Sequence, residues 1–354
     1  MIDEEFIQRH LVQRSLLSHL LTPAAGVYSL LQKSRMQRQL KRVIKADIPI
    51  IGIGNIVSGG SGKTPFTMAL AALMQQDGWR VAISHRGYKG GLENTPTLIA
   101  DDKGMLYEVD QSGDEAWMMA NALPGIPVAV GKDRLGVISL VQSLQPAVQA
   151  LIMDDVFQNH RFHKDVQIAC FDAELGLGNG RLIPAGYLRE QPEALRRADL
   201  CVISCKTPDA EATPLLEAIS PYCPWIEVLH YQPAGVYDLE GKRHEIGELE
   251  RTVLVSGIAA ASGFESLAEQ AGVDVCAHFA FGDHYHFRSR EALQPLLRLV
   301  QKESIRHVCT TAKDMPKLAQ HRDLAPLLLE LRIEPQAGQI EGIWNKIKER
   351  LENR

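Results

Sequence analysis

Short runs of apolar and β-branched residues alternate with longer stretches of mixed polarity along most of the chain. The short runs favour buried strands, and the longer stretches, with apolar residues at helical spacing, favour helices. Such an alternation predicts an α/β fold with a mostly parallel sheet and right-handed crossovers. The expected strands of the first part are residues 48–53, 79–84, 127–130, 150–153, 167–171 and 199–204, with helices over 66–76 and 116–123.

A second α/β pattern begins after a stretch rich in turns, near residue 246. Its expected strands are residues 252–258, 277–281 and 308–311, with helices over 264–271, 290–303 and 344–351. We therefore predict a P-loop NTPase-type, mostly parallel sheet domain, a second smaller α/β domain and an N-terminal amphipathic helical segment. The expected parts are 1–45 (helical segment), 46–222 (P-loop domain), 223–245 (linker or hairpin), 246–340 (second domain) and 341–354 (C-terminal helix).

The first 45 residues combine an apolar stripe at helical spacing, interrupted by Pro23, with a strongly basic end. They hold eight Lys or Arg against three acids, whereas the rest of the chain has a net charge of about −10. Such a segment can lie in a membrane interface and meet an anionic surface. The alternative is an ordinary amphipathic helix that packs on the domain and leaves its basic end in water.

The composition is that of a globular protein, with 354 residues, 45% hydrophobic and 23% charged. A net charge of −5 gives no reason to expect nucleic acid as a partner, and no protein partner is predicted. The six cysteines form no C-x-x-C pair, so we expect buried, reduced thiols of a cytosolic protein. No apolar run is long enough to span a bilayer, and we expect no secretory signal.

The strongest chemical signal is the glycine-rich loop between the strand at 48–53 and the following helix. Its glycines allow backbone N–H groups to turn towards an anion, and the helix N-terminus adds its positive dipole end. Lys63 is expected to contact the β- and γ-phosphates and Thr64 to ligate Mg²⁺. The usual first glycine of the pattern is replaced by Val57, so we expect the turn to use Gly59 and Gly60. The alternative is a glycine-rich turn that binds nothing. The expected nucleotide-binding residues are Ser58, Gly59, Gly60, Ser61, Gly62, Lys63, Thr64 and Arg86.

Two acids follow the apolar strand at 150–153 directly, at Asp154 and Asp155. A carboxylate at the end of a strand beside a phosphate loop can hold Mg²⁺ directly or through water, and its neighbour can position an attacking hydroxyl. The expected metal ligands are therefore Thr64, Asp154 and Asp155. A solvated acidic turn is the alternative.

Other loops carry weaker signals. Residues 85–90 form a basic, aromatic and glycine-rich loop at a strand end, where α/β sheets bind ligands. The long loop at 176–186 is too rich in glycine and proline for regular structure and is expected to be functional or mobile. Asp283, His284 and His286 invite a metal site, but two histidines without a third ligand are weak support, so substrate orientation or an ordinary structural role remains open.

The residues alone therefore predict Mg-nucleotide chemistry, and they leave several classes of P-loop protein open. The missing N-K-x-D motif disfavours a GTPase. A soluble kinase or ATPase with a non-lipid substrate and a nucleotide-dependent binding module without transfer activity both remain possible.

Motifs spread over residues 20–318 resemble the tetraacyldisaccharide 4′-kinase family, which acts in lipid A biosynthesis. The family's strand-and-loop signature is similar to residues 54–65, its S-R-G-Y-G motif to 85–89, its G-D-E motif to 113–115 and its D-D-G-F-Q-H motif to 154–159. The most specific similarity is G-N-G-R-L-x-P-A-G-x-L-R-E at residues 178–190. In the second domain, S-G-I, a D-H motif at 283–284 and T-T-x-K-D at 310–314 resemble further family motifs.

The chain departs from the family pattern at Val156 in place of glycine, at Asn159 in place of histidine and at Tyr187 in place of proline. Val156 restricts the backbone after the acidic pair. His160, one position further on, is a possible substitute for the missing imidazole.

The resemblance implies ATP- and Mg²⁺-dependent phosphorylation of the 4′-hydroxyl of a tetraacylated glucosamine disaccharide 1-phosphate. It further implies peripheral association with the cytoplasmic face of the inner membrane through residues 5–45. The implied catalytic residues are Lys63, Asp155 and a pair formed by Asp114 and His284, and Arg86 and Arg181 are candidates for phosphate contacts.

Overall fold

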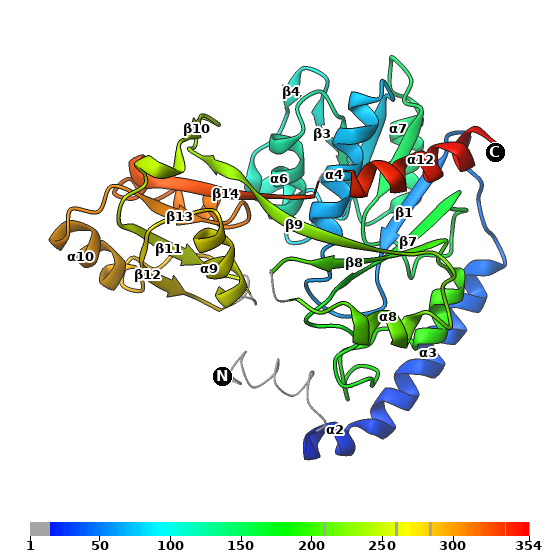
Figure 1. Cartoon of the computed structure of the whole chain (residues 1–354). Coiled ribbons are helices and arrows are strands. Elements are labelled where there is room, and N and C mark those ends of the chain that lie inside the picture. Colours follow the sequence, from blue (N-terminus) through cyan, green and yellow to red (C-terminus); the bar gives the residue numbers. More distant parts are fainter. Residues whose placement is uncertain (1–14, 208–209, 259–260, 283–284, 337, 354) are drawn as a thin grey trace. The chain divides into compact units, whose positions relative to one another are not determined.

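The computed structural model describes residues 15–207, 210–258, 261–282, 285–336 and 338–353 (Figure 1). The chain divides into two compact units. Unit 1 is formed chiefly by His230–Pro335, and unit 2 by the described residues up to Cys205 together with Glu211–Leu229 and the segment from Gln336 onwards. Each unit has a sheet and a hydrophobic core of its own.

Unit 2 is built on a mostly parallel sheet with the strand order β8-β7-β1-β6-β2-β5-β3-β4. The first six strands in this order are parallel, and the last two, β3 and β4, pair antiparallel. The strands are β1 (Ile50–Gly54), β2 (Val81–His85), β3 (Thr97–Asp101), β4 (Gly104–Met105), β5 (Val128–Val130), β6 (Ala150–Met153), β7 (Val166–Asp172) and β8 (Leu200–Cys205). Strands covered on both faces must be apolar on both faces, and every residue of β1 and β6 is buried.

The helices of unit 2 include α4, which follows the glycine loop, and α12, which lies beside α4 (Figure 1). Trp344 of α12 packs edge-to-face on Trp79, at a centroid distance of 5.3 Å, and donates from Nε1 to Asp77. The helices are α2 (Leu16–Leu20), α3 (Thr22–Leu40), α4 (Lys63–Gln76), α5 (Val109–Ser112), α6 (Asp114–Ala122), α7 (Arg134–Gln142), α8 (Thr213–Ile219) and α12 (Gln339–Glu352), with a 3₁₀ turn at Pro192–Arg197.

Unit 1 contains a smaller mixed sheet with the strand order β12-β11-β13-β14-β9. The first four strands in this order are parallel, whereas β9 is antiparallel to β14 and to β10. Its strands are β9 (Ile226–Tyr237), which begins before the unit boundary, β10 (Arg243–His244), β11 (Thr252–Ser256), β12 (Val275–Ala280), β13 (Val308–Thr310) and β14 (Leu328–Pro335). Its helices are α9 (Ala261–Gln270), α10 (Gln294–Lys302) and α11 (Met315–Leu318), with 3₁₀ turns at Ile246–Glu248 and Ala325–Leu327.

The α/β fold predicted from the sequence is confirmed, including the second α/β unit. The short edge strands β3 and β4 and the strand β14 were not expected. The stretch expected as a linker or hairpin contains the twelve-residue strand β9. Among the six cysteines, all free, five are buried as expected, but Cys276 is exposed.

Of the N-terminal segment expected to be helical, residues 1–14 lie outside the described residues, 16–40 are helical and 41–45 are not. The helix is interrupted next to Pro23, as expected, because α2 ends at Leu20 and α3 begins at Thr22. Helices α2 and α3 leave a row of large apolar side chains in solvent, which we call the α2–α3 apolar surface. Its members are Leu16, Leu17, Leu20, Val27, Leu30 and Leu31, from 38% to 86% exposed. None of the helices in the described part of the chain is both long and apolar enough to cross a membrane.

The segment is nevertheless attached to unit 2 through polar contacts. Ser18 is fully buried, and its hydroxyl donates to the carbonyl of Ala185 at 2.5 Å. Arg181 donates to the Ser18 carbonyl and to the Thr22 hydroxyl at 3.1 and 2.9 Å. The α2–α3 segment is therefore held against the loop at 176–190, with Ala25, Leu21 and Tyr28 packed at the core, while the residues of the α2–α3 apolar surface stay in solvent.

Candidate active site

The glycine loop connects β1 to α4, as the sequence predicts. Gly62 caps α4 with a φ of 77°, so the N–H groups of the first helical turn, which begins at Lys63, face the loop. The Ser61 hydroxyl accepts hydrogen bonds from Asn55 Nδ2 at 2.6 Å and from Lys63 Nζ at 3.3 Å. Helix N-terminus, glycines and lysine together form the donor set that a polyphosphate requires.

The loop turns at Gly59 and Gly62, which have φ values of 105° and 77°. The Ser61 N–H donates to the Gly59 carbonyl at 2.9 Å, which closes a tight turn centred on Gly60, so the expected turn on Gly59 and Gly60 is present and Gly62 adds a second one. Val57, which takes the place of the usual first glycine, is buried and pairs with Leu188 in an antiparallel bridge. A β-branched residue is suited to such an extended position, which explains why glycine is not needed there.

Tyr187 packs directly on the loop. A side chain at Gly59 would collide with the Tyr187 hydroxyl, because a Cβ atom there would lie 2.4 Å from it. The Tyr187 carbonyl also accepts a hydrogen bond from the N–H of Ser58 at 2.8 Å. The loop at 176–190 therefore supports the phosphate loop from one side.

Asp154 lies directly after β6, which is the parallel neighbour of β1. The carboxyl ends of the two strands meet at one edge of the sheet, and this brings the acidic pair to the glycine loop. Asp154 is buried, and its Oδ1 accepts from the N–H of Asp155 at 2.9 Å. Burial raises the pKa of the Asp154 carboxyl, and the nearby His85 and Lys63 oppose that rise.

Asp155 is the residue at which the chain turns after β6, with a φ of 52°. Its carboxylate lies 3.7 Å from Lys63 Nζ and accepts from Arg189 at 3.0 Å. Burial disfavours the charged form of Asp155, but Lys63, Arg189 and Arg134 together outweigh it and lower the pKa of Asp155. Because Asp155 adopts the positive φ, Val156 has an ordinary backbone conformation and packs in the core, so the missing family glycine is accommodated.

Arg134, at the start of α7, supports the acidic pair from within the core. Its guanidinium donates to the Asp154 carbonyl at 2.7 Å and to the Ser84 hydroxyl at 3.1 Å. Burial lowers the pKa of Arg134 to about 10, which still leaves it charged at neutral pH. The fixed cation holds the backbone of β6 in place at the point where the acids begin.

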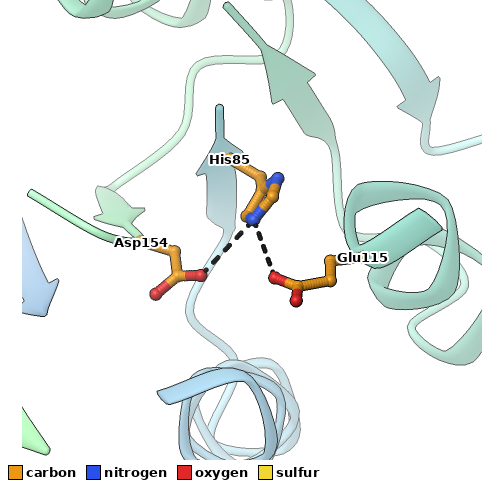
Figure 2. Close-up of side chains that lie close together, drawn as sticks. All are labelled: His85, Glu115 and Asp154. Carbon is orange, nitrogen blue, oxygen red and sulfur yellow. Dashed lines mark hydrogen bonds and ion pairs between the residues drawn. The ribbon is translucent and has the colours of Figure 1, made fainter. Parts of the chain in front are cut away.

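A second cluster adjoins Asp154 (Figure 2). His85, the last residue of β2, places Nε2 3.2 Å from Glu115 Oε2 and 3.7 Å from Asp154 Oδ2. Glu115 comes from the first turn of α6, next to Asp114. These three side chains are the group in the described part of the chain whose ligand atoms lie close enough together to hold a metal ion.

The end of the loop at 176–190 is joined to the acidic turn by a polar network. Glu190 accepts from Arg197 at 2.8 Å and from Gln158 at 3.0 Å, and Gln158 also donates to the carbonyl of Asn55. Asn55 in turn donates to Ser61 of the glycine loop. The network thus connects the two sequence motifs that carry the expected chemistry.

Some predicted site residues have other contacts. Arg86 donates a hydrogen bond to Glu93 at 2.7 Å, and Arg181 donates one to the α2–α3 segment. These contacts are not with residues of the glycine loop. Asp114 is half-buried at the first position of α6, and Thr64 is half-buried in the first turn of α4. His284 lies outside the described residues. His160 is buried, which lowers its pKa to about 4, so its imidazole is neutral.

The sequence reasoning did not assign roles to His85, Glu115 or Arg134. His85 lies in the motif at 85–89 and Glu115 in the motif at 113–115, and these motifs were the only hint of their roles in the sequence. Arg134 follows β5 and a short turn in the sequence. Only the order of the strands in the sheet shows that it reaches Asp154 at the end of β6.

Comparisons with known proteins agree with this geometry. The family model for tetraacyldisaccharide-1-P 4′-kinase matches residues 17–352. A tetraacyldisaccharide 4′-kinase of Geobacter metallireducens is 37% identical over 281 residues, covering 78% of this chain and 80% of the relative. One of Pelobacter propionicus is 34% identical over 336 residues, covering 92% and 90%.

The fold has also been seen experimentally. The crystal structure of LpxK from Aquifex aeolicus in complex with ATP superposes with a TM-score of 0.75. It covers 95% of this chain and 100% of the Aquifex chain, at 24% sequence identity.

Proposed function

Because the chain belongs to the tetraacyldisaccharide-1-phosphate 4′-kinase family, we propose that it transfers the γ-phosphoryl group of ATP to the 4′-hydroxyl of a tetraacylated glucosamine disaccharide 1-phosphate. One observation carries the proposal. The glycine loop at the start of α4 and the acidic pair after β6 lie at the same edge of the sheet, with Lys63 Nζ 3.7 Å from Asp155.

The residues at this edge fit a magnesium nucleotide. Loop N–H groups and Lys63 supply donors and positive charge for the β- and γ-phosphates, and Thr64, Asp154 and Asp155 supply the hard oxygen atoms that Mg²⁺ prefers. Bound Mg-ATP supplies the transferable phosphoryl group and a cation that neutralises charge on its oxygens. Lys63 forms an ion pair with Asp155 and a hydrogen bond with Ser61. The lysine therefore has to give up or weaken these contacts when it binds phosphates.

The acceptor hydroxyl requires a group that orients it and accepts its proton. The family resemblance gives this role to Asp114 and His284, with Asp114 at the positive end of α6. Phosphoryl transfer has a loose transition state, so positioning of the hydroxyl contributes more than removal of its proton. Asp114→Ala and His284→Ala are each expected to lower kcat strongly while the affinity for ATP changes little.

The decisive assay uses purified protein, Mg²⁺, ATP labelled at the γ-phosphate and a detergent-solubilised lipid disaccharide 1-phosphate. Label is expected to move to the lipid, and Lys63→Met is expected to abolish the transfer. Lys103→Met is the matched control, because Lys103 is exposed in the turn between β3 and β4. Transfer to a soluble acceptor would support a soluble kinase instead, and ATP hydrolysis independent of any acceptor would support a nucleotide-dependent module.

We propose further that the α2–α3 apolar surface binds the membrane that contains the acylated substrate, as a peripheral contact on its cytoplasmic face. The exposed leucines are attached to the rest of unit 2 through Ser18 and Arg181, so the surface is presented by a fixed helix pair. The basic residues from Lys33 to Lys45 follow directly and would meet anionic headgroups, each contributing on the order of 1 kcal/mol near the surface.

Liposome binding tests this surface. Replacing Leu16, Leu20, Leu30 and Leu31 together by glutamine should weaken binding to anionic vesicles by at least about 10-fold, because apolar area no longer enters the bilayer. Leu106→Gln, at a leucine of unit 2 that is 50% exposed and lies outside this surface, is the control and should bind normally. Undiminished binding of the fourfold variant would exclude the surface as the membrane contact.

A further inference from the structure

His85 lies between two carboxylates, those of Glu115 and Asp154 (Figure 2). Its ring is buried at the end of β2, with Nε2 facing Glu115 at 3.2 Å and Asp154 at 3.7 Å. The other ring nitrogen, Nδ1, receives the backbone N–H of Gly87 at 3.1 Å. The family motif similar to residues 85–89 begins with serine, so this imidazole is a feature of the present chain.

The contact with Gly87 fixes the tautomer of the ring. A backbone N–H can only donate, so Nδ1 must present a lone pair. A neutral imidazole carries one proton, which is then on Nε2, the nitrogen that faces both carboxylates. Gly87 cannot easily turn its N–H away, because it has a φ of 69° and is closely packed against Val130 and Ser112.

This tautomer decides between two roles for the cluster. A metal ion on Nε2 would require the lone pair there and the proton on Nδ1, where it would face the Gly87 N–H. A donor role requires no change, since Nε2–H already has Glu115 as its hydrogen-bond acceptor at 3.2 Å, with Asp154 Oδ2 further away at 3.7 Å. The geometry therefore favours a hydrogen-bond donor, although the three side chains lie within the spacing of a metal site.

We propose that His85 is a positioning residue that holds Glu115 by a hydrogen bond and keeps the same N–H facing Asp154, in the arrangement the transfer reaction requires. The inference rests on the proposed function, since Asp154 is the expected metal ligand and Glu115 is the neighbour of Asp114. Because Glu115 belongs to the first turn of α6, its hydrogen bond with His85 of β2 also fixes that turn. Asp154 is held at its backbone carbonyl by Arg134 and at its carboxylate by the Asp155 N–H, and its other carboxylate oxygen lies 3.7 Å from His85 Nε2. Groups behind a metal ligand orient it and tune its affinity for the ion.

Two matched substitutions distinguish the roles of the two ring nitrogens, Nδ1 and Nε2. His85→Asn keeps an acceptor near the position of Nδ1 for Gly87 and removes the donor. His85→Gln keeps an N–H near the position of Nε2. We expect His85→Asn to raise the Mg²⁺ concentration for half-maximal activity and to lower kcat, with KM for the lipid unchanged. The product of the two changes should be about 10- to 100-fold. His85→Gln should retain activity within about 3-fold of the wild type, as the conservative replacement of an outer donor.

A spectroscopic readout works without any turnover. In protein labelled with ¹⁵N-histidine, one ring should show a protonated Nε2 and an unprotonated Nδ1, and this signal should vanish in His85→Asn. Added Co²⁺, without nucleotide, should produce no absorption band that depends on His85. A Co²⁺ band lost in His85→Asn would overturn the donor role in favour of a metal ligand. Equal losses of activity in His85→Asn and His85→Gln, parallel to a lower melting temperature, would overturn it in favour of a purely structural role.

Binding of a fluorescent ADP as a function of Mg²⁺ separates failure of this inference from failure of the proposed function. If wild-type protein failed to phosphorylate the lipid but its Mg²⁺-dependent ADP binding weakened in His85→Asn alone, the positioning role would stand and the lipid assignment would fall. If the lipid were phosphorylated equally well by both variants with the same Mg²⁺ requirement, the positioning role would be excluded and the function would stand.

Discussion

The two units each carry a buried aspartate at the carboxyl end of a parallel sheet, and the two are held very differently. Asp314 of unit 1 lies close behind β13 and is fully buried. One of its oxygens accepts from the N–H of Gly257 at 2.8 Å and from the Thr311 hydroxyl at 2.9 Å, and the other faces Lys317 at 3.4 Å. Its acceptor positions are filled by neighbours that belong to the same turn or the adjacent strand end.

Asp154 and Asp155 of unit 2 are surrounded by side chains from separate elements instead. Lys63 comes from α4, His85 from β2 and Arg189 from the loop at 176–190. The lysine and arginine side chains can move and exchange their partners, whereas backbone N–H groups cannot. A strand-end aspartate therefore indicates a ligand site when mobile cations surround it and a structural role when its own turn satisfies it.

The largest expected effect that tests this contrast is that of Asp154→Asn. Loss of the proposed metal ligand, worth several kcal/mol, should lower kcat by about 1,000-fold or more. The free energy of unfolding should be unchanged or higher, because asparagine removes a charge that burial disfavours, as the raised pKa of Asp154 indicates. Steady-state kinetics and thermal unfolding measure both, with Asp102→Asn, an exposed carboxylate of unit 2, as the control.

The lysines that face these aspartates should differ in the same manner: replacing Lys63 should affect catalysis, and replacing Lys317 should not. Lys63→Met is expected to lower kcat/KM for ATP by about 100- to 1,000-fold, because a preorganised cation at the transferred phosphate is lost. Lys317→Met should leave kcat/KM nearly unchanged at a temperature where unit 1 is folded, because Lys317 is buried against Asp314. A large kinetic defect in Lys317→Met would contradict the structural role of that pair.

Asp314→Ala should act on stability. Loss of hydrogen bonds to a buried carboxylate costs about 2 to 3 kcal/mol and lowers the melting temperature of unit 1 by several degrees. All four tryptophans, Trp79, Trp117, Trp225 and Trp344, belong to unit 2, so tryptophan fluorescence follows unit 2 separately. Faster hydrogen exchange in β13, with the tryptophan transition less affected, is the expected signature. An unchanged exchange rate would show that Asp314 is not structural.

The smallest expected effect is that of Arg189→Gln. The carboxylate of Asp155 and its partner are each about one-third exposed, so loss of the ion pair should lower the free energy of unfolding by no more than about 1 kcal/mol at pH 7. The pKa of Asp155 is lowered in the folded protein, so the stabilisation is present above the ordinary aspartate pKa and disappears as acid protonates the folded carboxylate. Urea unfolding of variant and wild type should therefore converge at strongly acidic pH.

The sequence predicted the glycine loop and the acidic pair because each is a local pattern. Their proximity followed from the expected parallel order of the strands. The contacts of Arg134, His85 and Arg189 depend on which strands are neighbours, and no local pattern contains that information. The positive φ of Asp155 could not be anticipated either, since glycine at position 156 is the family's usual solution. The contacts of Arg181 with carbonyl and hydroxyl groups of the α2–α3 segment join distant parts of the chain, so the sequence could not predict them, and its phosphate contact stays a prediction.

The place of α12 has a consequence for synthesis. This helix packs on α4, the helix that follows the phosphate loop, yet it is separated in sequence from the rest of unit 2 by the whole of unit 1. During translation, α4 therefore lacks its apolar cover until unit 1 has been made. The packed pair of α4 and α12 can therefore form only after the residues of unit 1 that precede α12 have been synthesised.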